Sequence, residues 1–282
     1  MSNTTNAATQ PWVCPGCQAT VDTLHCPACG EKVLQAKDLT FMGLMRQVMQ
    51  SLSSVDSRLL RSLRMLTTRP GAITNAYVDG PRKPYIGPFQ LLLIVNVAFF
   101  AVQSFSGWPI FSTTLASHLH GQDWSALAQF MVASKLSAAH MTLATYAPVF
   151  DHAVDVNAKS LVIVLVVPFA LLLIPMFHGS GRPFVTHVVF ALHLLAFLLL
   201  CACALLLLTT VGGEALRSTA ADWILFAVLL VVIAKYLYLA TNKVYGASGV
   251  TRSLKVALLT VVIMAAVPGY RFLIFLVTLY YT

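Results

Sequence analysis

Residues 184–210 read FVTHVVFALHLLAFLLLCACALLLLTT and contain no Asp, Glu, Lys or Arg. A helix needs about 20 mostly apolar residues to cross the hydrocarbon core of a bilayer, so this stretch predicts a transmembrane helix. Four further apolar stretches satisfy the same rule, at residues 89–105, 160–177, 223–240 and 256–280. Prolines should kink the span at 160–177, and Pro268-Gly269 should break the last one.

The overall composition favours a membrane protein over a soluble one. The 282-residue chain is 58% hydrophobic and only 10% charged, whereas a soluble domain is about 45–50% apolar and about a quarter charged. Disorder is also excluded, because disordered chains have low hydrophobicity. We therefore predict an all-α polytopic membrane protein with about five transmembrane helices in residues 89–282.

The distribution of charged residues predicts the orientation of these helices. If the N-terminus is cytoplasmic, the cytoplasmic segments 1–88, 178–183 and 241–255 carry net charges of +4, +1 and +3, and the loops on the other side, 106–159 and 211–222, each carry −1. This pattern obeys the positive-inside rule and places the C-terminus outside the cytoplasm. It makes 106–159 an extracytoplasmic loop in which residues 124–150 form an external or interfacial helix. If residues 124–150 cross the membrane instead, everything downstream inverts.

Four cysteines near the N-terminus have the spacing of a zinc ribbon. Cys14 and Cys17 form one CxxC pair, and Cys26 and Cys29 form a second one after eight intervening residues. Four thiolates make a closed tetrahedral site, which is structural rather than catalytic. Zinc would supply the folding free energy that a segment of about 20 residues cannot obtain from its own core. We expect one structural Zn²⁺ in a cytosolic domain at residues 1–35; a disulfide pair and a redox CxxC are the alternatives.

Residues 36–88 are predicted to form a basic neck between the ribbon and the membrane. One helical face carries leucines and another carries arginines: Leu59, Leu60, Leu63 and Leu66 against Arg58, Arg61 and Arg64. This pattern is typical of a helix that lies in the membrane interface. The alternative is a helix docked on the protein's own body, with its arginines solvated. Arg82 and Lys83 directly precede the first span and are expected to contact lipid headgroups.

Polar residues inside the spans are candidates for a functional site, because polar groups are costly in hydrocarbon. The candidates are Asn96, His187, His193 and Arg271. The two histidines lie on different faces of one helix, so partners must come from a second helix. Asn96, Gln103 and Tyr270 are the expected partners. Interhelical hydrogen bonds that only hold the bundle together are the alternative to a metal, proton or ligand site.

Three blocks of sequence resemble a known family. They are Arg69-Pro70-Gly71 followed by YVDGPRKPYIGP at 77–88, HVVFALH at 187–193 followed by Ala196-Phe197, and KVYG at 243–246. Together with the CxxC pairs they resemble DUF3667, a bacterial domain-of-unknown-function family of zinc-ribbon multipass membrane proteins. The resemblance implies location and architecture rather than an activity. Thr186 stands where the family often has Glu, so a role that needs a carboxylate beside His187 is not expected.

These patterns favour a non-enzymatic protein of the bacterial inner membrane. The ribbon and the basic neck would dock a protein partner or anionic lipid, and the placement of the basic residues favours a membrane surface over nucleic acid. The alternative is a transporter or channel for a proton, an ion or a lipidic substrate that uses His187, His193 and Arg271. A membrane enzyme ranks lowest, because no nucleophile or carboxylate pair is visible. The sequence does not specify an oligomeric state.

Overall fold

The computed structural model describes residues 11–14, 17–23, 26–28, 57–80, 82–213 and 218–282. The chain forms two compact units, Met1–Ser57 and Arg58–Thr282. Cys29 and most of the predicted neck before residue 57 lie outside the described residues.

The N-terminal unit contains a small antiparallel sheet. β1 (Trp12–Val13) pairs with β2 (Thr20–Val21) so that Trp12 lies opposite Val21. The turn between the strands is closed by a 2.8 Å hydrogen bond from Gln18 N–H to the Cys14 carbonyl. Cys14, Val21 and Cys26 are buried together, so thiol groups make up much of this small core.

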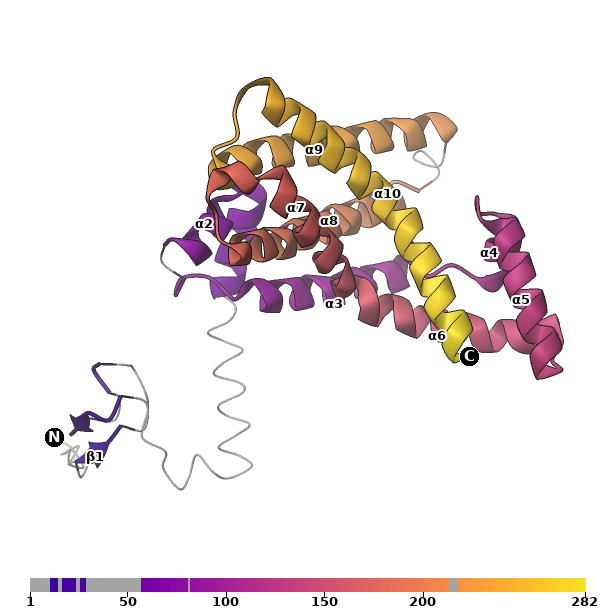
Figure 1. Ribbon diagram of the computed structural model, residues 1–282, viewed down its shortest axis with the longest axis horizontal. Coiled ribbons are helices and arrows are strands. Elements are labelled where there is room, and N and C mark those ends of the chain that lie inside the picture. The colour runs from indigo at the N-terminus through magenta and orange to yellow at the C-terminus, as the bar shows by residue number, and fades with distance from the viewer. Residues whose placement is uncertain (1–10, 15–16, 24–25, 29–56, 81, 214–217) are drawn as a thin grey trace. The chain divides into compact units, whose positions relative to one another are not determined.

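The second unit is helical (Figure 1). It begins with a helix described at residues 57–68, which is called the neck helix here for its place before the first span. The elements that follow are α2 (Ala72–Val78), α3 (Pro88–Ser106), α4 (Leu115–His120), α5 (Ser125–Ala139), α6 (Leu143–Leu161), η2 (Val162–Leu165), α7 (Val166–Met176), η3 (His178–Ser180), α8 (Phe184–Val211), α9 (Thr219–Tyr245) and α10 (Gly249–Tyr281).

Five helical runs are long and apolar enough to cross a membrane, which confirms the predicted membrane-protein fold. They are α3, the continuous run Leu143–Met176, α8, α9 and α10. The second run starts well before the predicted boundary at residue 160, because the amphipathic helix α6 continues through η2 into α7. α5 has 15 residues, and its rise of about 22 Å is shorter than the roughly 30 Å hydrocarbon core.

The prolines affect the spans in different ways. The Pro168 ring lacks the N–H that would bond to the Val164 carbonyl, and the chain takes 3-10 geometry over η2, just before this proline. The predicted break at Pro268-Gly269 is wrong, because α10 runs without interruption from Gly249 to Tyr281. A proline removes a single helical hydrogen bond, and packed transmembrane helices tolerate that loss. Here Ile263 and Tyr270, on either side of Pro268, are both buried.

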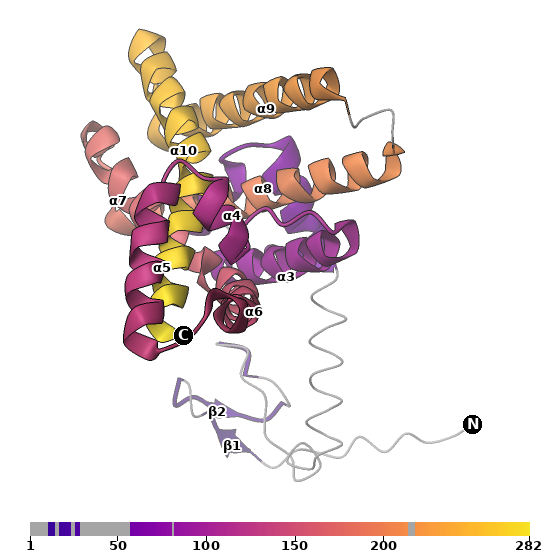
Figure 2. The ribbon, with the colours of Figure 1, turned by 90° about the vertical axis from the view of Figure 1, so that its right-hand side faces the viewer.

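α8 is the central helix of this unit. It packs against α3, α7 and α2, and both views show it between α3 and α9 (Figures 1 and 2). α10 packs against α9 and α6. The core therefore forms around the apolar stretch from which the fold was predicted.

The segment between α3 and the second span covers the C-terminal end of α10. The Lys135 ammonium in α5 donates to the Leu279 carbonyl. From α6, the Tyr146 hydroxyl lies 2.6 Å from the Thr282 hydroxyl, and the Asn157 amide donates to the Thr278 hydroxyl over 3.0 Å. α5 and α6 therefore enclose the last turns of α10.

The two ends of the helical unit differ in charge. We call one of them the basic end: α3, α8 and α10 begin there, and α7 and α9 end there (Figure 1). Among the described residues, the charged side chains at this end are Arg58, Arg61, Arg64, Arg69, Asp79, Arg82, Lys83, Arg182, Lys243, Arg252 and Lys255. Those toward the opposite end are Asp123, Lys135, Asp151, Asp155, Lys159, Asp222 and Arg271, and Lys235 lies within α9 between the two ends.

Candidate functional site

The strongest candidate site is the cysteine cluster of the N-terminal unit. The sulfur atoms of Cys14, Cys17 and Cys26 all lie within 4.8 Å of one another. The Cys17 and Cys26 sulfurs are 3.4 Å apart, which is much longer than the roughly 2.05 Å of a disulfide bond. Cys14 and Cys26 are buried, and Cys17 is exposed.

The geometry of this cluster suits a metal ion. A tetrahedral Zn²⁺ with bonds of about 2.3 Å to sulfur places the sulfur atoms about 3.8 Å apart. The β1–β2 turn and the second CxxC segment bring three thiols within 4.8 Å of one another, which is close to that separation. These three cysteines can therefore hold a metal ion, while Cys29, the fourth predicted ligand, lies outside the described residues.

The three family-like sequence blocks meet at the basic end of the helical unit. Gly71 packs so closely on α9 that a Cβ atom at this position would lie 2.9 Å from the Ala240 carbonyl oxygen. The Asn75 amide donates to the Lys243 carbonyl over 2.7 Å. Arg182 forms an ion pair with Asp79 and also donates to the Val244 carbonyl. Segments far apart in the sequence are thus joined by polar contacts around the first turns of α8.

Both intramembrane histidines take part in this junction. The Nδ1 atom of His193 lies 3.0 Å from the Thr74 hydroxyl, and the Nδ1 atom of His187 lies 3.1 Å from the Tyr245 hydroxyl. The Tyr245 ring stacks on His187 and on Phe177. The partners expected from the sequence, Asn96, Gln103 and Tyr270, are wrong in each case. Gln103 instead accepts from Ile110 N–H, and the Tyr270 hydroxyl donates to the Ala158 carbonyl.

Two buried polar atoms on α8 have no hydrogen-bond partner among the described residues. They are Nε2 of His193 and the Thr186 hydroxyl oxygen. Seven residues separate them, which puts them on the same face of the helix. Thr186 is the position where the resembled family often has Glu, and here it leaves an unsatisfied polar group in the core.

Asn96 and Arg271 lie elsewhere in the unit. Asn96, in α3, donates to the Lys159 carbonyl of α6 over 3.3 Å. Arg271, toward the opposite end, donates from Nε to the Ile110 carbonyl over 2.8 Å. It also lines a pocket of about 610 Å³ that it shares with Asp222 and apolar residues of α8 and α9. Arg271 therefore lies apart from His187 and His193, so the three residues of the transport alternative do not form one site.

The two predicted headgroup contacts lie on the surface at the basic end. Arg82 and Lys83 are both exposed. The Arg82 guanidinium lies 5.4 Å from the centre of the Tyr77 ring. The Lys83 carbonyl accepts a 2.9 Å hydrogen bond from Arg58 of the neck helix, so the neck helix and this loop hold each other in place.

Outside the spans, His118 is a strongly perturbed titratable group. Its Nδ1 atom accepts from the Trp124 indole N–H over 3.2 Å, and its ring centre lies 4.7 Å from that of Phe275. Burial, together with the positive charge of Arg271, lowers the pKa of His118 to about 4. The His118 ring packs against the rings of Trp124, Phe150 and Phe275.

This depressed pKa predicts a loss of stability in acid. The unfolded chain protonates His118 below pH about 6.5, and the native protein does so only below about 4. The free energy of unfolding should therefore fall as the pH drops through this window, by about 2 kcal/mol between pH 7.5 and 5. Melting of the detergent-solubilised protein at both pH values measures the fall. It should shrink in His118→Gln and persist in a variant of the exposed His152, His152→Gln; an unchanged pH dependence in His118→Gln would rule the effect out.

Comparison with protein-family models matches residues 56–100 to a family described as "Protein of unknown function (DUF3667)". This segment includes the neck helix, α2 and most of α3, and it contains the first of the three quoted sequence blocks. The match confirms the resemblance to this family. The chain has no match among curated proteins and none among solved structures.

Proposed function

We propose that this protein is a docking protein of the bacterial inner membrane. Its N-terminal ribbon holds one structural Zn²⁺ in the cytoplasm and binds a protein partner, and the basic end of its helical unit contacts anionic lipid. The C-terminus lies outside the cytoplasm. The residues proposed for zinc are Cys14, Cys17, Cys26 and Cys29.

The observation that carries this proposal is the cluster of three cysteine sulfurs within 4.8 Å. With Cys29 as the fourth thiolate, the site keeps no open coordination position, so it supports a fold rather than a reaction. The sheet also leaves Val13 exposed at 60% of its surface. A small rigid module with an exposed apolar side chain is suited to contact another protein.

The proposed orientation follows from the charges at the two ends. Basic side chains dominate the basic end, while acidic and basic ones are mixed at the other. Short loops rich in Lys and Arg stay in the cytoplasm. The anionic inner leaflet then faces Arg82 and Lys83, and reduced thiols in the ribbon fit the same compartment.

Copurification from mild detergent tests this proposal. Proteins that copurify with the full chain are compared with those retained by a variant in which all four ribbon cysteines are serine. The ribbon partner should disappear from the variant, because a ribbon without metal does not fold. A variant with Cys201→Ser and Cys203→Ser in α8 is the matched control and should keep the partner. Identical sets of proteins from all three would refute docking by the ribbon.

A further inference from the structure

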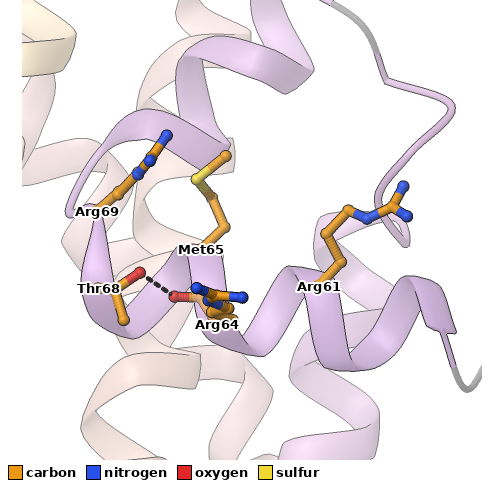
Figure 3. Close-up of a pocket in the computed structure, with 5 residues that line it drawn as sticks. All are labelled: Arg61, Arg64, Met65, Thr68 and Arg69. Atoms are coloured by element: carbon orange, nitrogen blue, oxygen red, sulfur yellow. Dashed lines mark hydrogen bonds between the residues drawn. The ribbon is translucent and has the colours of Figure 1, made fainter.

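We propose that Arg61, Arg64 and Arg69 bind the phosphate group of an anionic phospholipid. These three side chains line a hollow of about 500 Å³ together with Met65 and Thr68. Figure 3 shows Met65 between Arg69 and Arg61, with Arg64 on the same helix. The inference deepens the proposed function, on whose cytoplasmic placement of the basic end it rests, and it adds a site to the contacts at Arg82 and Lys83.

The packing of the neck helix directs these arginines outward. Ser62 and Leu66 are fully buried on the opposite face. The Ser62 hydroxyl also accepts a 3.1 Å hydrogen bond from Ile86 N–H. The helix is therefore packed on the protein's own body through this face. Because its inner face is fixed, Arg61 and Arg64 project from a rigid platform.

The charge of the hollow favours an anion. Among the described residues, its lining includes three guanidinium groups and no acidic side chain. Within the part of the chain that the structure describes, Asp79 is the acidic residue at the basic end, and it pairs with Arg182 rather than with these arginines. Guanidinium groups bind phosphate oxygens through paired, charge-assisted hydrogen bonds. Phosphate is therefore the chemistry that this hollow fits.

An exposed leucine beside the arginines favours a lipid over free phosphate. Leu60 is 67% exposed and precedes Arg64 by one helical turn, so the two side chains are neighbours on the surface. The neck helix also lies at the end where α3 and α8 begin, which is the level of the lipid headgroups. A phospholipid offers a phosphate to the arginines and an acyl chain to Leu60. Free phosphate would leave Leu60 in water.

Lipid binding by the delipidated, full-length protein tests the site. Native mass spectrometry compares short-chain phosphatidylglycerol, short-chain phosphatidylcholine and inorganic phosphate. The wild-type protein should bind phosphatidylglycerol at least about tenfold more tightly than the other two. The variant R61Q/R64Q/R69Q should lose about 100-fold in this affinity, because each basic side chain near a membrane surface contributes about a factor of five.

A charge-matched variant separates a site from general attraction. K243Q/R252Q/K255Q removes the same charge at the same end, at residues outside the proposed headgroup contacts, and should stay within a few-fold of wild type. Equal losses in the two triple variants, or inorganic phosphate binding as tightly as phosphatidylglycerol, would overturn the proposal. If R61Q/R64Q/R69Q does not fold, R61Q/R64Q provides the same comparison. The assay detects no protein partner, so its outcome is independent of the copurification result.

Discussion

Replacing Cys14 with serine should lower the zinc content of the purified protein from about one equivalent to less than about a tenth. The metal should account for most of the ribbon's stability, since zinc binding contributes about 10–16 kcal/mol of apparent free energy in peptides of this size. Serine is a poor zinc ligand at neutral pH. Cys14 is also part of the small buried core with Val21 and Cys26, so its loss removes a ligand and a packing contact together. Elemental analysis after desalting measures the ratio of zinc to protein.

The control is Cys201→Ser, because Cys201 lies in α8 and outside the cluster. It should keep the full equivalent of zinc. Since the ribbon and the helices are separate compact units, Cys14→Ser should also leave the melting of the helical unit close to that of wild type. One equivalent of zinc that persists after all four ribbon cysteines become serine would show that the metal binds elsewhere.

Hydropathy predicted the membrane fold because it is a local property of the chain. Each of the five spans contains enough consecutive apolar residues to be found without knowledge of its neighbours. The cysteine cluster was predictable for the same reason, since its spacing places the sulfurs through tight turns. In contrast, the start of the second helical run at Leu143 depends on how α6 packs against α10 through Tyr146 and Asn157.

The partners of the histidines could not be predicted, because they depend on contacts between helices. Thr74 precedes the first span, and nothing in its surroundings marks it as a partner of His193. Tyr245 had a weak signal, since it lies within the KVYG block, but a block does not indicate which residue it faces. The family-like blocks marked the segments that lie together. The residue pairs that they form, Thr74 with His193 and Tyr245 with His187, are visible only in the structure. The predicted break at Pro268 failed for the same reason, since it also depends on tertiary contacts. Packing of the neighbouring turns keeps α10 continuous.

Gly71→Ala should destabilise the helical unit by about 2–5 kcal/mol. Gly71 has a φ of +78°, which costs a residue with a side chain about 1–2 kcal/mol. The added Cβ would also lie 2.9 Å from the carbonyl oxygen and 3.0 Å from the Cα atom of Ala240, which are backbone atoms of a packed helix and cannot rotate away. Displacing them costs about 1–3 kcal/mol more. Thermal melting in detergent, compared with wild type, measures the change.

Two other glycines separate the contributions of backbone conformation and steric contact. Gly246 has a similar φ of +66° but no neighbour within 4 Å of an added Cβ, so Gly246→Ala should cost only the conformational part, about 1 kcal/mol. Gly87 has an ordinary φ of −61° and open space, and its replacement by alanine should have a smaller effect. The excess cost of Gly71→Ala over Gly246→Ala then measures how tightly the loop after the neck helix is held against α9. If the two variants melt alike, the contact at Ala240 contributes nothing, and Arg69-Pro70-Gly71 is only a turn rather than the point that attaches the neck to the bundle.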